Sequence, residues 1–163
     1  MAAPASALPL AGIRVLDLSR VLAGPWCGMV LGDFGAEVIK LEHPERGDDT
    51  RDWGLRVGKT ETPYFNSVNR NKRSVTLDLK LPEAQKIALD LARQCDVVIQ
   101  NFKYGDAERM GLGYEDCAKL NPRIIYAVGT GFGPYNQELT FVNQGGWKLS
   151  RASVEQLVAA AGY

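Results

Sequence analysis

The 163-residue sequence predicts an α/β protein built on a Rossmann-like parallel sheet with flanking helices. Short apolar runs typical of strands alternate with helical patterns along the chain, which is the signature of successive βα units. The first run, at 13–18, leads through Gly24 and Pro25 directly into a helical pattern. The composition, 45% hydrophobic and 23% charged, is that of a globular chain with one core of ordinary size.

Each element follows from a local signal in the sequence. Proline suits the first turn of a helix, and this predicts helix starts at Pro25 and Pro82. Gly35 suits a left-handed helix end, and Ile87 and Leu91 give the second helix an apolar face. We expect strands at 13–18, 37–41, 74–79, 96–100 and 123–128, and helices at 25–34, 82–94, 106–110 and 114–120.

The turn between the first strand and the first helix is the first candidate for a binding site. Gly24 permits a close approach of the backbone, and Pro25 suits the first helical turn. The free N–H groups and the positive dipole end of that helix favour an anionic or polar ligand. In an α/β protein a nucleotide-like cofactor is expected at this place.

Charge and cysteine usage exclude several function classes. Lys plus Arg and Asp plus Glu both total 19, so the overall charge gives no case for nucleic acid or an anionic membrane surface. No apolar run is long enough to span a bilayer, and the start of the chain does not resemble a secretory signal. The three cysteines are odd in number and lack ligand spacing, which predicts free buried thiols and a cytoplasmic location.

The stretch 42–69 is rich in charge, glycine and threonine, and is expected to be either a long functional loop or a mobile one. Its acidic residues suggest a metal site, but neighbouring arginines favour internal pairing within a solvated loop. The acids are Asp48, Asp49 and Asp52, and the arginines are Arg46 and Arg51.

His43 lies in the same stretch and is the only histidine of the chain. It has no accompanying pattern of a serine, cysteine or acid that would form a triad. It is therefore expected to be a loop residue and not a catalytic base.

Several separated motifs together resemble the N-terminal region of class III coenzyme A transferases. This is the CaiB/BaiF type, which includes formyl-CoA transferases and succinyl-CoA:dicarboxylate CoA-transferases. The motifs are IRVLDLSRVLAGP at 13–25, LGDFGAEVIK at 31–40 and NRNKRS at 69–74. Taken alone, Lys72 and Arg73 in the last motif are typical of a solvated strand entry.

The resemblance covers about residues 10–135, which implies a CoA-transferase-like domain at 1–135 and a divergent tail at 136–163. It implies a fold that is incomplete relative to the two-domain family fold. Members of the family resemble intertwined dimers, so we expect a homo-oligomer or a partner chain that supplies the missing half.

The resemblance also implies a coenzyme A cleft, with coenzyme A or acyl-CoA as substrate and no separate cofactor. Arginine and lysine would meet the phosphates, and a flat apolar contact would hold the adenine. The matching positions are Val21, Leu22 and Ala23 in the turn, Leu77 and Lys80 at the adenosine end, Asn101 and Phe102 after a strand, Arg109 at a phosphate, and His43 where some members have arginine.

The activity that the resemblance implies is transfer of CoA between an acyl-CoA and a carboxylic acid. In the family an aspartate attacks the thioester, forms a mixed anhydride and then carries CoA as an aspartyl thioester. No aspartate follows Asp116 here, so no catalytic residue is assigned, and a truncated form, a divergent end or a shifted reading frame is expected. Two alternatives stay open: a non-catalytic CoA-binding or interaction module, and a fragment of the related acyl-CoA racemase branch.

Overall fold

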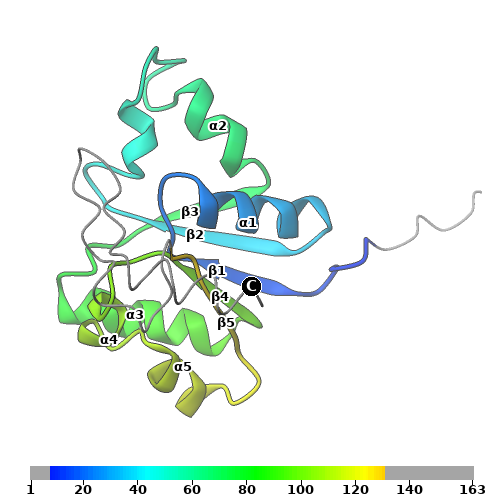
Figure 1. Ribbon diagram of the computed structural model, residues 1–163, viewed down its shortest axis with the longest axis vertical. Helices are drawn as coiled ribbons and strands as arrows, with labels where there is room; N and C mark the ends of the chain where they lie inside the picture. The colour runs from blue at the N-terminus through cyan, green and yellow to red at the C-terminus, as the bar shows by residue number, and fades with distance from the viewer. Residues whose placement is uncertain (1–7, 131–163) are drawn as a thin grey trace, which may run out of the picture. The chain divides into compact units, whose positions relative to one another are not determined.

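The computed structural model describes residues 8–130, which form a five-stranded sheet with helices on both faces (Figure 1). Every strand pairing is parallel and the strand order is β3-β2-β1-β4-β5. The elements are β1 Arg14–Asp17, α1 Ala23–Asp33, β2 Glu37–Glu42, the 3-10 helix η1 Asp49–Asp52, α2 Pro63–Asn69, β3 Lys72–Thr76, α3 Pro82–Arg93, β4 Val97–Gln100, α4 Asp106–Arg109, α5 Tyr114–Leu120 and β5 Ile125–Val128. The predicted α/β fold with a Rossmann-like parallel sheet is confirmed.

The sheet belongs to one compact unit, Met1–Gly129. The predicted domain boundary at residue 135 and the tail at 136–163 lie outside the described residues. Among residues 8–130, no helix is long and apolar enough to cross a membrane.

The three inner strands are buried because both of their faces are covered by helices. Val15 and Leu16 on β1 and Val98 on β4 are fully buried, as expected for the near-continuous apolar runs of parallel strands. Val15 pairs with Val38 of β2, and Leu16 pairs with Val98. The edge strands β3 and β5 are more exposed.

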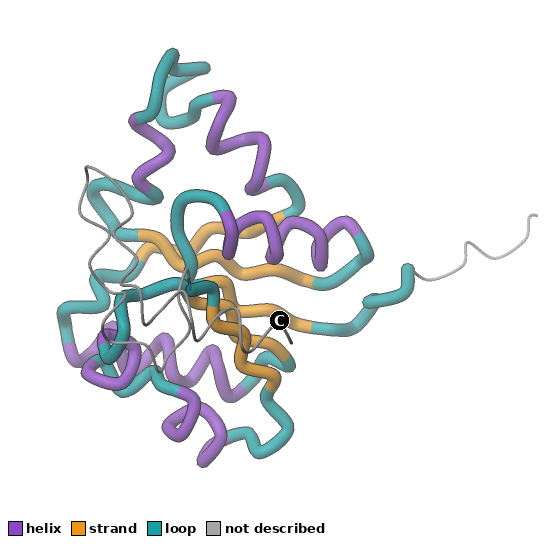
Figure 2. The backbone as a smooth tube through the Cα atoms, in the orientation of Figure 1, coloured by secondary structure: helices purple, strands orange, loops and turns teal. Residues whose placement is uncertain are grey.

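Successive residues of each strand point to opposite faces, which gives the sheet two apolar cores. The larger core lies under α3 and α5 and includes Leu16, Val98 and Cys117. The smaller one, around Val15 and Val38, lies on the face that α1 covers (Figure 2). Towards the carboxyl ends of the strands the α1 face becomes polar, although it remains buried.

The bounds predicted for the third strand were wrong, and Lys72 does not have the role that is typical of it when it is taken alone. The strand was expected at 74–79, but β3 runs from Lys72 to Thr76, because its partner β2 ends at Glu42 and only Leu77 N–H reaches beyond it, to the Glu42 carbonyl at 2.9 Å. Lys72 does not solvate a strand entry: its side chain is 2% exposed and donates to Asp17 Oδ2 at 2.9 Å. Arg73 is exposed, as is typical of a residue at a solvated strand entry.

The stretch 42–69 is more structured than predicted, because it contains η1 and the helix α2. Thr62 caps α2 by accepting a hydrogen bond from Phe65 N–H at 3.1 Å, and Pro63 occupies the first turn. This Thr-Pro pair is an ordinary helix start signal, and the charge of the surrounding segment obscured it.

Candidate functional site

The sheet reverses its winding between β1 and β4, since β2 and β3 lie on one side of β1 while β4 and β5 lie on the other. In open α/β sheets, ligands bind in the crevice outside the carboxyl ends of the strands at such a point. The segments that follow β1 and β4 meet there. Asn101 donates from Nδ2 to the Arg20 carbonyl at 2.7 Å and accepts from Arg20 N–H at 2.9 Å through Oδ1.

A pocket of about 360 Å³ opens at this edge of the sheet. Its walls come from residues at or after the carboxyl ends of β1, β2, β3 and β4, and from α4 with the residue after it. The described lining residues are Leu18, Arg20, Leu41, Glu42, His43, Arg46, Leu77, Asp78, Leu79, Lys80, Phe102, Asp106, Arg109 and Met110.

Five of the nine sequence-predicted site residues line this one pocket, although they come from four separate segments. They are His43, Leu77, Lys80, Phe102 and Arg109. The other four, Val21, Leu22, Ala23 and Asn101, lie at the switch point beside it and do not line it.

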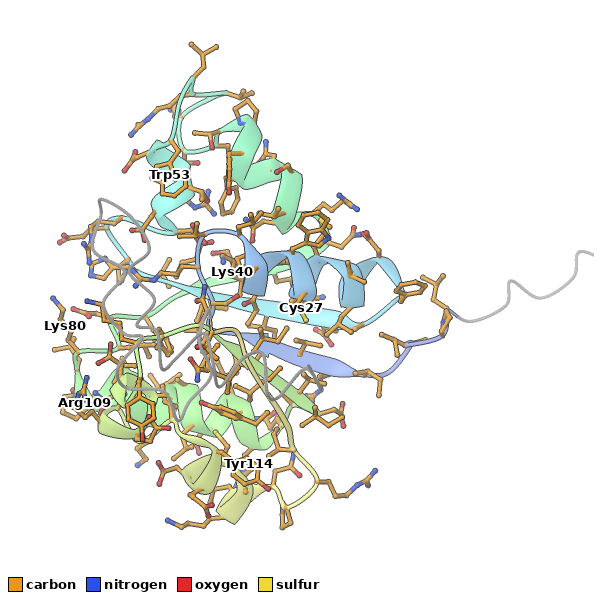
Figure 3. The ribbon with its side chains drawn as sticks, viewed as in Figure 1. Cys27, Lys40, Trp53, Lys80, Arg109 and Tyr114 are labelled. Carbon is orange, nitrogen blue, oxygen red and sulfur yellow. The ribbon has the colours of Figure 1, made fainter. Side chains whose placement is uncertain are left out.

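The rim of the pocket carries cations that have few partners. Within the described residues, neither the Lys80 ammonium nor the Arg46 guanidinium forms an ion pair. Arg109 pairs with Asp106 on the same helix, and Figure 3 shows Lys80 and Arg109 at the same end of the sheet. Exposed pairs of this kind exchange readily for a ligand, because each contributes little stability.

The floor of the pocket is apolar. Leu77 and Phe102 are half-buried and pack against the larger core, as does Met110. Leu77 lies directly after the end of β3 at Thr76 and lines the pocket. A flat apolar surface beneath a ring of cations suits a ligand that combines an aromatic ring with phosphates.

His43 is held by its own loop. Its Nδ1 accepts hydrogen bonds from Glu45 N–H at 3.2 Å and Arg46 N–H at 3.4 Å. Its Nε2 lies 4.0 Å from Asp78 Oδ1 on the pocket wall. These contacts fit the prediction of a loop residue, and they direct the outer ring nitrogen towards Asp78 at the pocket wall.

The model of CoA-transferase family III matches residues 10–145. The chain belongs to this family. It is 54% identical over 125 residues to a succinyl-CoA:glutarate CoA-transferase of Mus musculus, covering 77% of this chain and 29% of that protein. It is 44% identical over 125 residues to a formyl-CoA:oxalate CoA-transferase of Afipia carboxidovorans, covering 77% of this chain and 30% of that protein.

A crystal structure of a CaiB/BaiF family protein from Brucella suis has the same fold, with a TM-score of 0.73 and 37% identity over 94% of this chain and 48% of that chain. The predicted membership of the family is thus confirmed. The chain spans less than a third of the length of the two curated relatives. The family match continues to residue 145, ten residues past the boundary expected at 135.

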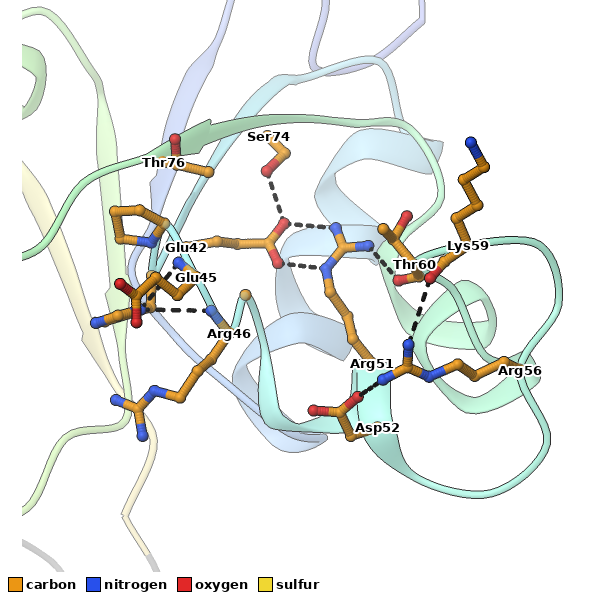
Figure 4. A pocket seen from close by; sticks show the side chains of 13 residues that line it. Glu42, Glu45, Arg46, Arg51, Asp52, Arg56, Lys59, Thr60, Ser74 and Thr76 are labelled. Atoms are coloured by element: carbon orange, nitrogen blue, oxygen red, sulfur yellow. Dashed lines mark hydrogen bonds and ion pairs between the residues drawn. The ribbon is translucent and has the colours of Figure 1, made fainter.

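A second, polar pocket of about 390 Å³ adjoins the first in this family III chain and shares Glu42, His43 and Arg46 with it. Figure 4 shows Arg51 holding the Glu42 carboxylate through two nitrogens, at 2.6 and 2.8 Å. Ser74 donates to the same carboxylate at 2.7 Å. Burial alone would raise the pKa of Glu42, but Arg51 and Ser74 outweigh it and hold that pKa below its usual range.

The predicted pairing of the acidic cluster with Arg46 and Arg51 was wrong, although Asp52 does pair within the segment, with Arg56. Asp48 pairs with Lys40 of β2 and not with a neighbouring arginine, and Asp49 faces Arg20 at 3.5 Å. Asp48 is fully buried, so this part of the segment is not a solvated loop. Within residues 8–130, no group of three or more potential metal ligands is present.

Sequence reasoning also missed Arg20 and Arg46 as pocket residues. Arg20 follows a predicted strand by two residues, and residues just beyond strand ends meet at one edge of a parallel sheet. That signal was available for Arg20. The sequence carried no such signal for Arg46, because the path of the segment after β2 depends on the burial of Asp48.

The turn between β1 and α1 is tightly packed, as predicted for Gly24. A Cβ added at Gly24 would lie 2.2 Å from Ser19 Cβ and 2.3 Å from Ser19 Oγ. Ser19 is itself buried and its N–H donates to Asp17 Oδ1 at 3.0 Å. The close approach of turn and helix therefore requires glycine at position 24.

Proposed function

We propose that the chain binds coenzyme A or an acyl-CoA in the switch-point pocket. As part of a family III CoA-transferase, it would then act in transfer of CoA between an acyl-CoA and a carboxylic acid. The observation that carries the proposal is the gathering of five resemblance-matched residues in one pocket at the carboxyl edge of the sheet. Coenzyme A is the substrate in this proposal, and no further cofactor is required.

The chemistry of the pocket supports this ligand. Coenzyme A carries a diphosphate and a 3′-phosphate, and Lys80, Arg109 and Arg46 offer charge-assisted hydrogen bonds to such groups. The adenine ring would lie against Leu77 and Phe102. His43 in place of arginine gives a phosphate contact that strengthens only when the imidazole is protonated.

Calorimetric titration of the 163-residue chain with free coenzyme A tests the proposal. Lys80→Ala and Arg109→Ala should each weaken binding by about tenfold, since each removes a cation that faces a phosphate. Lys86→Ala on α3 and Arg123→Ala before β5 are matched controls, because both are exposed and neither lines the pocket. Equal affinity in all four variants would contradict the placement of the ligand.

A non-catalytic CoA-binding module is the second candidate. Two carboxylates of the pocket are paired with cations: Glu42 pairs with Arg51, and Asp106 pairs with Arg109. Neither is therefore a free nucleophile, which favours a module without catalysis. A transfer assay with succinyl-CoA and glutarate on the same preparation separates the two. Turnover supports a transferase, while binding without turnover supports the module; release of α-deuterium from an acyl-CoA would instead indicate the racemase branch.

We further propose that the chain self-associates and acts in the cytoplasm. Helix α1 exposes Trp26 and Val30, and its C-cap residue Phe34 is exposed four residues further on, so the three form one apolar stripe. Light scattering over a concentration series tests self-association: a mass above that of a 17.8 kDa monomer is expected. A constant monomer mass at high concentration would contradict it.

A further inference from the structure

We propose that Lys40 and Asp48 act as a positioning pair that holds the β1–α1 turn in its ligand-binding conformation. This inference rests on the proposed CoA site, because that turn borders it. The two residues come from β2 and from the segment after it, so the pair joins that segment to a turn far away in sequence. Neither residue lines the switch-point pocket.

The pair is buried and makes direct contacts with the turn. Lys40 Nζ lies 2.9 Å from Asp48 Oδ2, and the two side chains are 1% and 0% exposed. The same Nζ donates to the Ser19 carbonyl at 2.8 Å. Val21 N–H is 3.3 Å from both carboxylate oxygens of Asp48, so it donates to the carboxylate as a whole.

The turn needs such a restraint because Val21 has φ of 73°. This left-handed conformation is an outlier for a β-branched residue, and it persists only where the surroundings fix it. Asp48 accepts the N–H of that very residue, while Lys40 holds the carbonyl two residues earlier. The two contacts therefore fix the backbone immediately before the strained residue, and helix α1 begins two residues after it.

Asp48 is itself held rigidly. Its Oδ1 accepts from Thr50 N–H at 3.0 Å and Thr50 Oγ1 at 2.7 Å, and its own N–H donates to Glu42 Oε2 at 2.9 Å. Thr62 Oγ1 in turn donates to the Thr50 carbonyl at 2.6 Å. The carboxylate cannot follow the turn if the turn relaxes, which is the property a positioning group needs.

The restraint reaches the pocket through Arg20. This residue stands between Ser19 and Val21, lines the pocket, and is bridged on its other side by Asn101. A buried ion pair contributes little stability compared with apolar residues of similar size, because both charges lose their hydration. Fixing the conformation of the turn is the role that this network's geometry supports.

A double-mutant cycle tests the pair. In the chain that keeps Val21, Asp48→Asn should weaken coenzyme A binding by about tenfold, because the turn is released and relaxes from its strained conformation. In the Val21→Gly background the loss should be about threefold or less, since glycine adopts positive φ without strain. Equal losses in both backgrounds would overturn the proposal, as would an unchanged affinity.

Because Asp48→Asn leaves Lys40 buried beside a neutral partner, the same cycle is run with Lys40→Met/Asp48→Leu, which removes both charges. This variant leaves the Ser19 carbonyl and the Val21 N–H without these partners, so it should be less stable than the wild type, and its loss of affinity should show the same dependence on Val21. Val38→Ala is the matched control, because it opens the smaller core on the same strand without touching the turn. It should lower stability and leave coenzyme A affinity unchanged.

Amide hydrogen exchange at Val21, measured without ligand, separates this inference from the proposed function. Exchange at Val21 should be about tenfold faster in Asp48→Asn than in the wild type, while exchange at Val98 changes much less. Unchanged exchange at Val21 would overturn the positioning role. If the wild type binds no coenzyme A, the proposed function fails, and the exchange result alone decides whether the pair restrains the turn.

Discussion

The Asn101 side chain and the Arg20 backbone exchange two hydrogen bonds, at 2.7 and 2.9 Å, across the point where the sheet reverses its winding. One amide group thereby ties the segment after β4 to the segment after β1. The two segments lie 81 positions apart in the sequence. The resemblance to the family marks Asn101 as a ligand contact, and the geometry shows that it also closes the switch point.

Replacing Asn101 by alanine should therefore affect both stability and binding. The loss of two hydrogen bonds should lower the free energy of unfolding by about 1–2 kcal/mol. Coenzyme A affinity should fall by about tenfold, because the turn that carries Arg20 loses its partner. Chemical denaturation and calorimetric titration measure the two effects.

Asn121→Ala is the control for this variant. Asn121 also donates from its side chain to a backbone carbonyl, that of Cys95 at 2.8 Å, but it lies at the opposite edge of the sheet, before β5. The Asn121→Ala variant should be less stable than the wild type and should keep its affinity for coenzyme A. Equal loss of affinity in both variants would mean that Asn101 acts only through general stability.

Much of the fold could be predicted from the sequence because its signals are local. Apolar runs predicted the strands, and Pro82 marked the start of α3, so α3 falls within one residue of expectation, while α1 begins two residues before Pro25. The bounds of β3 could not be obtained this way. They depend on where its partner β2 ends, which is a property of the sheet and not of the segment.

Packing in the β1–α1 turn should make Gly24→Ala destabilising by at least about 2 kcal/mol, because the new Cβ overlaps Ser19. Combining it with Ser19→Gly removes both overlapping atoms. The third nearest atom, Ile99 Cγ2, would lie at an ordinary 3.7 Å. The double variant should regain part of the stability in thermal unfolding; a further loss would contradict the packing argument.

Acid should destabilise the chain through Glu42 and Asp48. Burial would raise both pKa values, but Arg51 at Glu42 and Lys40 at Asp48 outweigh it and lower them. A carboxyl with a lowered folded pKa stabilises the fold above its unfolded pKa, near 4, and this contribution is lost as pH falls through the folded value.

Denaturant midpoints should therefore be nearly constant from about pH 7 to 5 and should fall below about pH 4. Glu42→Gln should be less stable at neutral pH and should show a shallower acid limb, because it removes one titrating group. An acid limb of unchanged slope in that variant would show that Glu42 is not part of the linkage.

The three thiols should react at different rates. Cys27 is exposed, which corrects the expectation that all three are buried, while Cys95 and Cys117 are buried. Burial raises the pKa of each buried thiol to about 11, so little thiolate forms at neutral pH. A thiol reagent should label one cysteine rapidly in the native chain and all three in denaturant; two rapid thiols would contradict this.

The candidate site was less predictable than the fold. Leu77 and Phe102 were assigned through the resemblance to the family, and the parallel sheet explains why they meet, since it brings the carboxyl ends of its strands together. Lys40 and Asp48 could not be placed from the sequence, because a charged residue in a strand and an acid in a polar segment both favour solvent when taken singly. Only their mutual contact makes burial of each acceptable.

In the proposed function, the switch-point pocket holds the nucleotide end of coenzyme A. Intermolecular nuclear Overhauser effects between the bound ligand and the labelled chain test it most directly. We expect contacts from the adenine protons to the Leu77 methyl groups and the Phe102 ring. Contacts confined to other surfaces, or none under conditions where the ligand is bound, would contradict it.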